Sequence, residues 1–137
     1  MGYRSAVRII TTKKGFEELK KFNDNYLKDK KENYSLLDEC SIMQDNNKVC
    51  YFGWDWVKWY EGSYPAVDAI SDGLNHLADN DYSYRFARIG ENYDDYEESC
   101  NDSEEKEDEY LEFPSMIREF DDDYVLNNMI EEEKEVV

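Results

Sequence analysis

Carboxylates are the side chains of this sequence that are numerous and close enough together to act as a group. Residues 91–137 hold 20 Asp or Glu against 3 Lys or Arg. Such a group can attract a basic partner, hold a hard cation such as calcium, or only keep the chain hydrated. We expect a partner-binding surface made of Asp94, Asp95, Glu97, Glu98, Glu104, Glu105, Glu107, Asp108, Glu109, Asp121, Asp122 and Asp123.

Aromatic and aliphatic residues run through the same acidic region. They are Tyr93, Tyr96, Tyr110, Leu111, Phe113, Met116, Ile117, Phe120, Tyr124, Val125, Leu126 and Ile130. A disordered acidic tail is poor in such residues, so the pattern favours a folded segment that presents carboxylates. The alternative is a solvated extension that serves only solubility, which is the usual role of a run of charge.

The charge is distributed unevenly along the chain. Residues 1–31 carry a net charge of +5, residues 32–90 carry −6 and residues 91–137 carry −17, which together make the total of −18. Direct binding to nucleic acid or to an anionic membrane is disfavoured, because both need a positive patch. The hypothesis is that the acidic surface imitates the phosphate charge of a nucleic acid and occupies the basic channel of a nucleic-acid-binding protein.

Residues for catalysis, cofactors or metal binding are sparse. His76 is the only histidine, the six glycines form no phosphate-binding loop, and we predict no enzyme, no catalytic residue and no cofactor. The stretch 79–83 begins like a calcium loop, but Tyr84 stands where that loop requires glycine. No metal site is therefore predicted.

The length and composition of the chain indicate its cellular compartment and its number of domains. Cys40, Cys50 and Cys100 are an odd number of cysteines in no metal-binding spacing, and no apolar run has the length of a membrane helix. We expect an intracellular protein in reducing surroundings. The 137 residues suit a single domain, 1–137.

The first 90 residues contain the pattern of an α+β core. Alternation predicts strands at 3–11, 36–44, 48–60 and 82–90, with a hairpin turn at 45–47. Apolar residues at spacings of three and four predict a helix from residue 13 to about 28 and a second one from Pro65 to about Asp79. The order β-α-β-β-α-β is typical of a ferredoxin-like fold, with both helices on one face of an antiparallel sheet.

Residues 91–137 are expected to be an acidic addition to this core. We predict a helical or irregular segment at 92–109, a short strand at 110–113 and a helix from about residue 121 to 135. A helix at 94–109 would place its carboxylates on adjoining turns, in rows like those of a duplex backbone.

Four blocks of the sequence resemble small acidic proteins that are encoded by phages and prophages of Gram-positive bacteria. The blocks are Met1-Gly2-Tyr3-Arg4-Ser5, Phe52-Gly53-Trp54-Asp55-Trp56-Val57-Lys58-Trp59-Tyr60, Asn80-Asp81-Tyr82-Ser83-Tyr84-Arg85-Phe86-Ala87-Arg88-Ile89-Gly90-Glu91 and Arg118-Glu119-Phe120-Asp121-Asp122-Asp123-Tyr124. This group brings no catalytic motif, so no active-site residue is carried over from it.

The resemblance implies a phage protein that acts in the cytoplasm of the host bacterial cell. In charge and size the chain is similar to anti-CRISPR proteins that mimic DNA, which implies a host CRISPR effector such as Cas9 as the partner. The alternative is a non-catalytic phage regulatory or assembly module that binds a protein partner, with the acidic region serving solubility.

Overall fold

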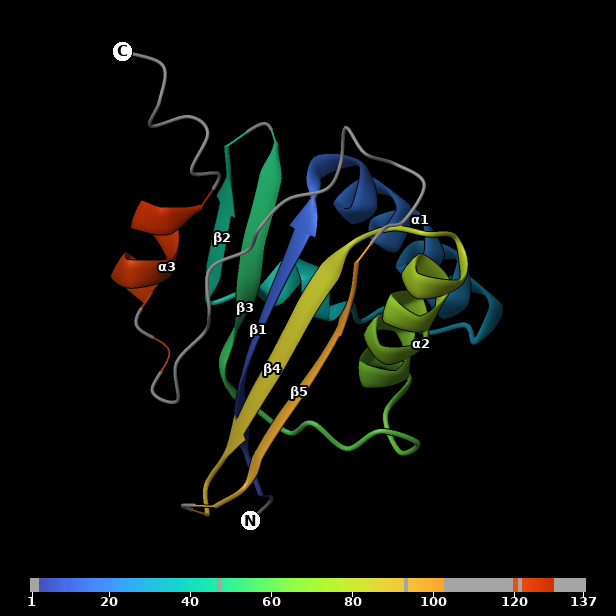
Figure 1. The fold of residues 1–137 in the computed structure, drawn as a ribbon. Helices are drawn as coiled ribbons and strands as arrows, with labels where there is room; N and C mark the ends of the chain where they lie inside the picture. The colour runs from blue at the N-terminus through green and yellow to red at the C-terminus, as the bar shows by residue number, and fades with distance from the viewer. Residues whose placement is uncertain (1–2, 47, 93, 103–119, 121, 130–137) are drawn as a thin grey trace.

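A computed structural model describes residues 3–46, 48–92, 94–102, 120 and 122–129 of the chain. It contains an antiparallel sheet with the strand order β2-β3-β1-β4-β5 (Figure 1). The elements are β1 Ser5–Thr12, α1 Lys13–Asp29, the 3₁₀ helix η1 Leu36–Glu39, β2 Ile42–Asp45, β3 Val49–Val57, α2 Pro65–Asp79, β4 Tyr84–Gly90, β5 Tyr96–Asn101 and α3 Asp122–Asn128. The α+β class predicted from the sequence is confirmed.

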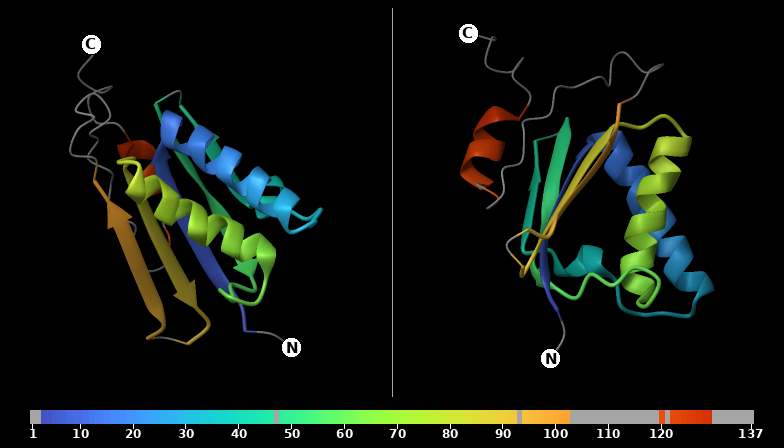
Figure 2. Two further views of the ribbon diagram at one scale, coloured as in Figure 1. Left: turned by 90° about the vertical axis from the view of Figure 1, so that its right-hand side faces the viewer. Right: turned by 60° about the horizontal axis from the view of Figure 1, so that its bottom comes forward.

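The helices form layers on both sides of the sheet. Figure 2 shows α1 and α2 together on one face, and α3 on the other. The main core lies under α1 and α2 and includes Ile9, Phe52 and Ile70, all fully buried. A smaller apolar cluster holds α3 to the opposite face, where its Val125 packs with Tyr51.

Local signals set the ends of several elements. Thr12 caps α1 by accepting a hydrogen bond of 2.9 Å from the Gly15 amide, and α2 begins at Pro65. Asn46 closes the β2–β3 hairpin, because its side-chain oxygen accepts hydrogen bonds from the amides of Lys48 and Val49. Both helices and this hairpin agree with the sequence prediction.

The segment that follows β4 differs from the prediction. The expected helical or irregular segment at 92–109 is wrong for Tyr96–Asn101, which form the edge strand β5. The cause is cross-strand pairing: Glu97 lies opposite Arg88 in the antiparallel register and binds it, and Ser, Cys and Asn at 99–101 are weak helix formers. The described sheet therefore contains the four strands predicted for the core and, in addition, β5.

Other predicted elements are shortened or lie outside the described residues. Of the strand predicted at 36–44, only Ile42–Asp45 is extended, and Leu36–Glu39 form η1. The helix predicted at 121–135 is observed as α3, Asp122–Asn128, and the strand predicted at 110–113 lies outside the described residues. None of the helices in the described part of the chain has both the length and the hydropathy that a membrane span requires.

Gly53 of β3 lies where β1 passes too closely for a side chain. A Cβ atom at this position would stand 1.9 Å from the backbone oxygen of Val7 and 2.9 Å from Cδ of Arg8. Neither the backbone nor the buried Arg8 side chain can withdraw without disturbing the β1–β3 pairing. The absence of a side chain here also leaves the space in which the Arg8 side chain lies.

We expect Gly53→Ala to lower the free energy of unfolding by about 1–3 kcal/mol, the usual cost of overpacking a well-packed site. Urea denaturation measures the change. Ser99→Ala on the exposed strand β5 is the matched control, with an expected change of at most about 0.5 kcal/mol. A Gly53→Ala protein as stable as the control would contradict the close approach.

Candidate partner-binding surface

Arg88 of β4 binds two of the candidate carboxylates at the start of β5. Its Nη2 donates to Oδ1 of Asp95 at 2.8 Å and its Nε donates to Oε1 of Glu97 at 2.9 Å. Asp95 also accepts a hydrogen bond of 2.6 Å from the Tyr3 hydroxyl. The hydrogen bond to Asp95 is the largest cause of the raised pKa of Arg88. The neighbouring carboxylates therefore stabilise the charged form of the Arg88 side chain. Asp95 and Glu97 therefore tie β5 to β4 and the N-terminal segment.

Arg8 of β1 is almost completely buried and uses all five of its N–H donors. Its Nη1 donates to the backbone oxygens of Val7 and Trp54 at 3.0 and 3.1 Å. Its Nε and Nη2 donate to the two carboxylate oxygens of Asp122 at 3.0 and 3.2 Å, and Nη2 also donates to Asp55. This group, with Tyr51 and Phe120, is called the Arg8 cluster below.

The Arg8 cluster attaches α3 to the sheet. Tyr51 donates a hydrogen bond of 2.7 Å from its hydroxyl to Asp122, and the Arg8 guanidinium lies over the Phe120 ring at 5.4 Å from its centroid. Burial acts to raise the pKa of Asp122, but hydrogen bonds from Arg8 and Tyr51 outweigh it, so that the pKa is lowered. Burial and the bond to Asp122 raise the pKa of Tyr51. Asp122 is thus an anchor of α3 and carries its charge inside an ion pair.

The remaining described candidates point to solvent. Asp94 and Asp123 are exposed, and Glu98 is exposed while accepting a hydrogen bond from the Tyr96 hydroxyl. Glu98 lies opposite Ala87, which in turn lies opposite Arg8, so Glu98 is on the sheet face that carries α3. The candidates Glu104, Glu105, Glu107, Asp108, Glu109 and Asp121 lie outside the described residues.

The predicted row of carboxylates does not form along β5. Successive residues of a strand point to opposite faces, so Glu97 lies on the side of α1 and α2 and Glu98 on the other. Asp55, which the sequence analysis did not single out, belongs to the Arg8 cluster. The available signal was Arg8 itself, which lies between Val7 and Ile9 and is the one charged residue of the strand Ser5–Thr12.

Arg85 and Arg88 pair with neighbouring carboxylates, Arg85 through a contact of 2.7 Å to Asp102. In the described residues, no group of three or more His, Cys, Asp or Glu side chains is arranged to hold a metal ion.

Acidification is expected to release α3 from the sheet. The pKa of Asp122 is lower in the folded chain than in the unfolded one, so its ion pair stabilises the docked helix above the ordinary pKa of an aspartate. That stabilisation is lost as the pH falls through the lowered pKa. NMR signals of the Val125 methyl groups, followed below about pH 4, report the loss of packing.

Asp122→Asn should bring the same release at neutral pH, with a loss of about 1–3 kcal/mol, less than for a fully buried pair because Asp122 is one-third exposed. Asp123→Asn, one residue along the same helix and exposed, is the control and should leave α3 docked. Identical hydrogen exchange of the α3 amides in both variants would contradict the anchoring role of Asp122.

Comparison with known proteins gives no relative for this chain: no family model, no curated protein and no solved structure matches it.

Proposed function

We propose that the protein is a non-catalytic inhibitor, encoded by a phage, that occupies the basic nucleic-acid channel of a host defence protein. A CRISPR effector such as Cas9 is the proposed target, and the host cytoplasm is the proposed site of action. The exposed carboxylates take the place of nucleic-acid phosphates and meet the Lys and Arg residues of the channel.

The observation that supports this proposal is the uneven distribution of charge along the chain. Residues 13–31 and 65–79, which include α1 and α2, contain seven Lys and seven Asp or Glu and are electrically balanced. The excess of acid falls in residues 91–137. Eight of the twenty Asp and Glu of this region lie in described residues, on or beside β5 and α3. A coat of charge that served only solubility would not need this uneven distribution.

Aromatic side chains accompany the exposed acids and add contact area. Tyr96 lies on the α3 face of β5 and Tyr124 lies on α3, and their side chains are 36% and 45% exposed. Tyr is enriched among the residues that dominate binding energy at protein interfaces. Asp94, Glu98 and Asp123 with these two tyrosines are the described part of the proposed contact surface.

The ion pairs limit how many carboxylates are available to a partner. Asp95, Glu97 and Asp122 are held by arginines of the same chain, so each of them already has a cationic partner. This observation favours the second candidate function, a phage regulatory or assembly module in which the acids stabilise the fold and keep it hydrated. The two functions differ in whether the exposed acids alone control binding.

We also propose a ferredoxin-like unit for the part of the chain from β1 to β4, which has the element order β-α-β-β-α-β when η1 is set aside. In this proposal β5 extends the unit at one edge and α3 covers part of the face opposite to α1 and α2.

Reversing only the exposed acids tests the proposed function. The triple variant Asp94→Lys, Glu98→Lys and Asp123→Lys leaves the three arginine-bound carboxylates in place. We expect it to inhibit DNA cleavage by guide-loaded Cas9 about tenfold less well or worse, because each reversal turns an attraction into a repulsion. Inhibition by the unaltered protein should also weaken steeply as salt is raised.

The matched control reverses three exposed acids of the helix layer, Glu17→Lys, Asp72→Lys and Asp79→Lys, which changes the net charge by the same amount. Inhibition by this control should stay within about threefold of the original, since only general screening changes. Equal loss in both triples, or no inhibition of the nuclease by the unaltered protein, would refute the proposed site.

A further inference from the structure

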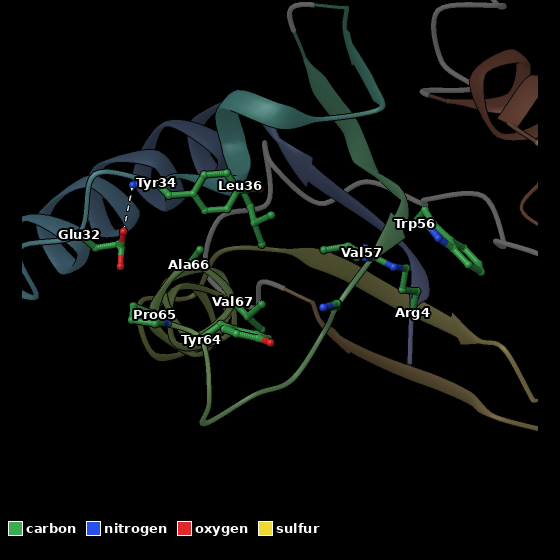
Figure 3. A pocket seen from close by; sticks show the side chains of 11 residues that line it. Arg4, Glu32, Tyr34, Leu36, Trp56, Val57, Tyr64, Pro65, Ala66 and Val67 are labelled. Carbon is green, nitrogen blue, oxygen red and sulfur yellow. Dashed lines mark hydrogen bonds between the residues drawn. The ribbon is translucent and has the colours of Figure 1, made fainter. Parts of the chain in front are cut away.

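A pocket separate from the acidic surface lies between the chain before η1, the end of β3 and the first turn of α2. It has a volume of 380 Å³, within the range of about 300–1,000 Å³ that ligand pockets usually have. Figure 3 shows Tyr34 and Leu36 on one side and Tyr64 and Val67 of the α2 start on the other, with Arg4 beyond Val57.

The pocket is lined mainly by apolar and aromatic side chains, several of them unusually exposed. Tyr34, Trp56 and Tyr64 are 48%, 63% and 40% exposed, while the neighbouring Trp54 and Trp59 are buried in the core. Figure 3 shows the Tyr34 and Tyr64 side chains on the hollow, while the Trp56 ring projects away from them beyond Val57. Exposing the two phenols at one hollow costs hydration free energy that the core positions avoid. A ligand with an apolar, planar body would cover these rings.

Two cations, Arg4 and Lys58, line this pocket, and the Glu91 carboxylate accepts a hydrogen bond from the Arg4 backbone amide. Arg4 and Lys58 are half-buried, and neither side chain forms an ion pair with a described carboxylate. By contrast, the side chains of Arg8, Arg85 and Arg88 are all paired with Asp or Glu.

The polar groups around the two cations favour an anion from outside the chain. Glu32, the acid that lines the pocket, accepts a hydrogen bond from the Tyr34 backbone amide at the far end from Arg4. Helix α2 begins at the pocket with no capping side chain from Tyr64, and the partial positive charge of this helix end faces the pocket as well as Asp68 in its first turn. An anionic group beside Arg4 and Lys58 would gain charge-assisted hydrogen bonds.

We propose that this pocket binds a small organic anion with a planar aromatic body and a single phosphate or carboxylate group. The rings of Tyr34 and Tyr64 and the apolar wall around Leu36 receive the body, and Arg4 and Lys58 receive the charge. The proposal does not rest on the inhibitor function, because none of its residues belongs to the acidic contact surface.

Titration of isotope-labelled protein with two probes tests the proposal. One probe is 2-naphthoate, which carries a carboxylate group. The other is adenosine 5′-monophosphate, which carries a phosphate group, and its separate parts, adenosine and inorganic phosphate, are titrated as well. We expect at least one anionic probe to saturate below about 1 mM and to bind about tenfold or more tightly than either part. The amide signals that shift should cluster at Tyr34, Val57 and Ala66.

The double variant Arg4→Gln and Lys58→Gln should weaken that probe about tenfold. The control Lys28→Gln and Lys48→Gln removes the same charge at exposed positions outside the pocket and should bind as the original does. Failure of both anionic probes at 1 mM, or signal shifts in the unaltered protein that avoid the pocket, would overturn the proposal even where the double variant folds poorly. Equal weakening in both double variants would show only a general charge effect and would overturn it as well.

Discussion

The buried guanidinium of Arg8 is the interaction on which the arrangement around the sheet depends. A cation in a core strand is tolerated only when its donors are satisfied, and here five acceptors from Val7, Trp54, Asp55 and Asp122 surround it. These acceptors come from β1, β3 and α3, so one side chain joins two core strands to the C-terminal helix. Removing an acceptor would leave a buried N–H donor of the Arg8 guanidinium without a hydrogen bond. The placement of α3 and the pairing of β1 with β3 are therefore linked through Arg8.

Pairing with Arg8 and Arg88 divides the candidate acids of the C-terminal region into two groups. Asp95, Glu97 and Asp122 are bound by arginines and act inside the fold, while Asp94 and Asp123 face solvent. Proximity in sequence does not decide the group, because Asp122 and Asp123 are neighbours with opposite roles. The function of the exposed group is therefore a question about particular carboxylates and not about the total charge.

The sequence pattern predicted the elements whose signals are local. Helix α2 was predicted from Pro65 and its apolar stripe, and the β2–β3 hairpin from the residues around Asn46, because capping, turn formation and periodicity act within a few residues. Strand β5 was missed since the acids at 94–98 have a helix-like spacing and the pairing of Glu97 with Arg88 acts across strands. The sequence also did not indicate which candidate carboxylates are paired with arginines inside the fold, because that pairing depends on tertiary contacts. The separation of Glu97 and Glu98 onto opposite faces followed only once β5 was known to be a strand.

The central claim is that the exposed acids compete with nucleic acid for a basic channel, and capture with DNA competition tests it most directly. The immobilised protein is mixed with host-cell lysate at low and moderate salt, and excess duplex DNA is then added. The account predicts that a nucleic-acid-binding nuclease is retained, that DNA displaces it and that moderate salt weakens it. A partner whose retention is indifferent to DNA and salt, or retention of no partner, would contradict the account.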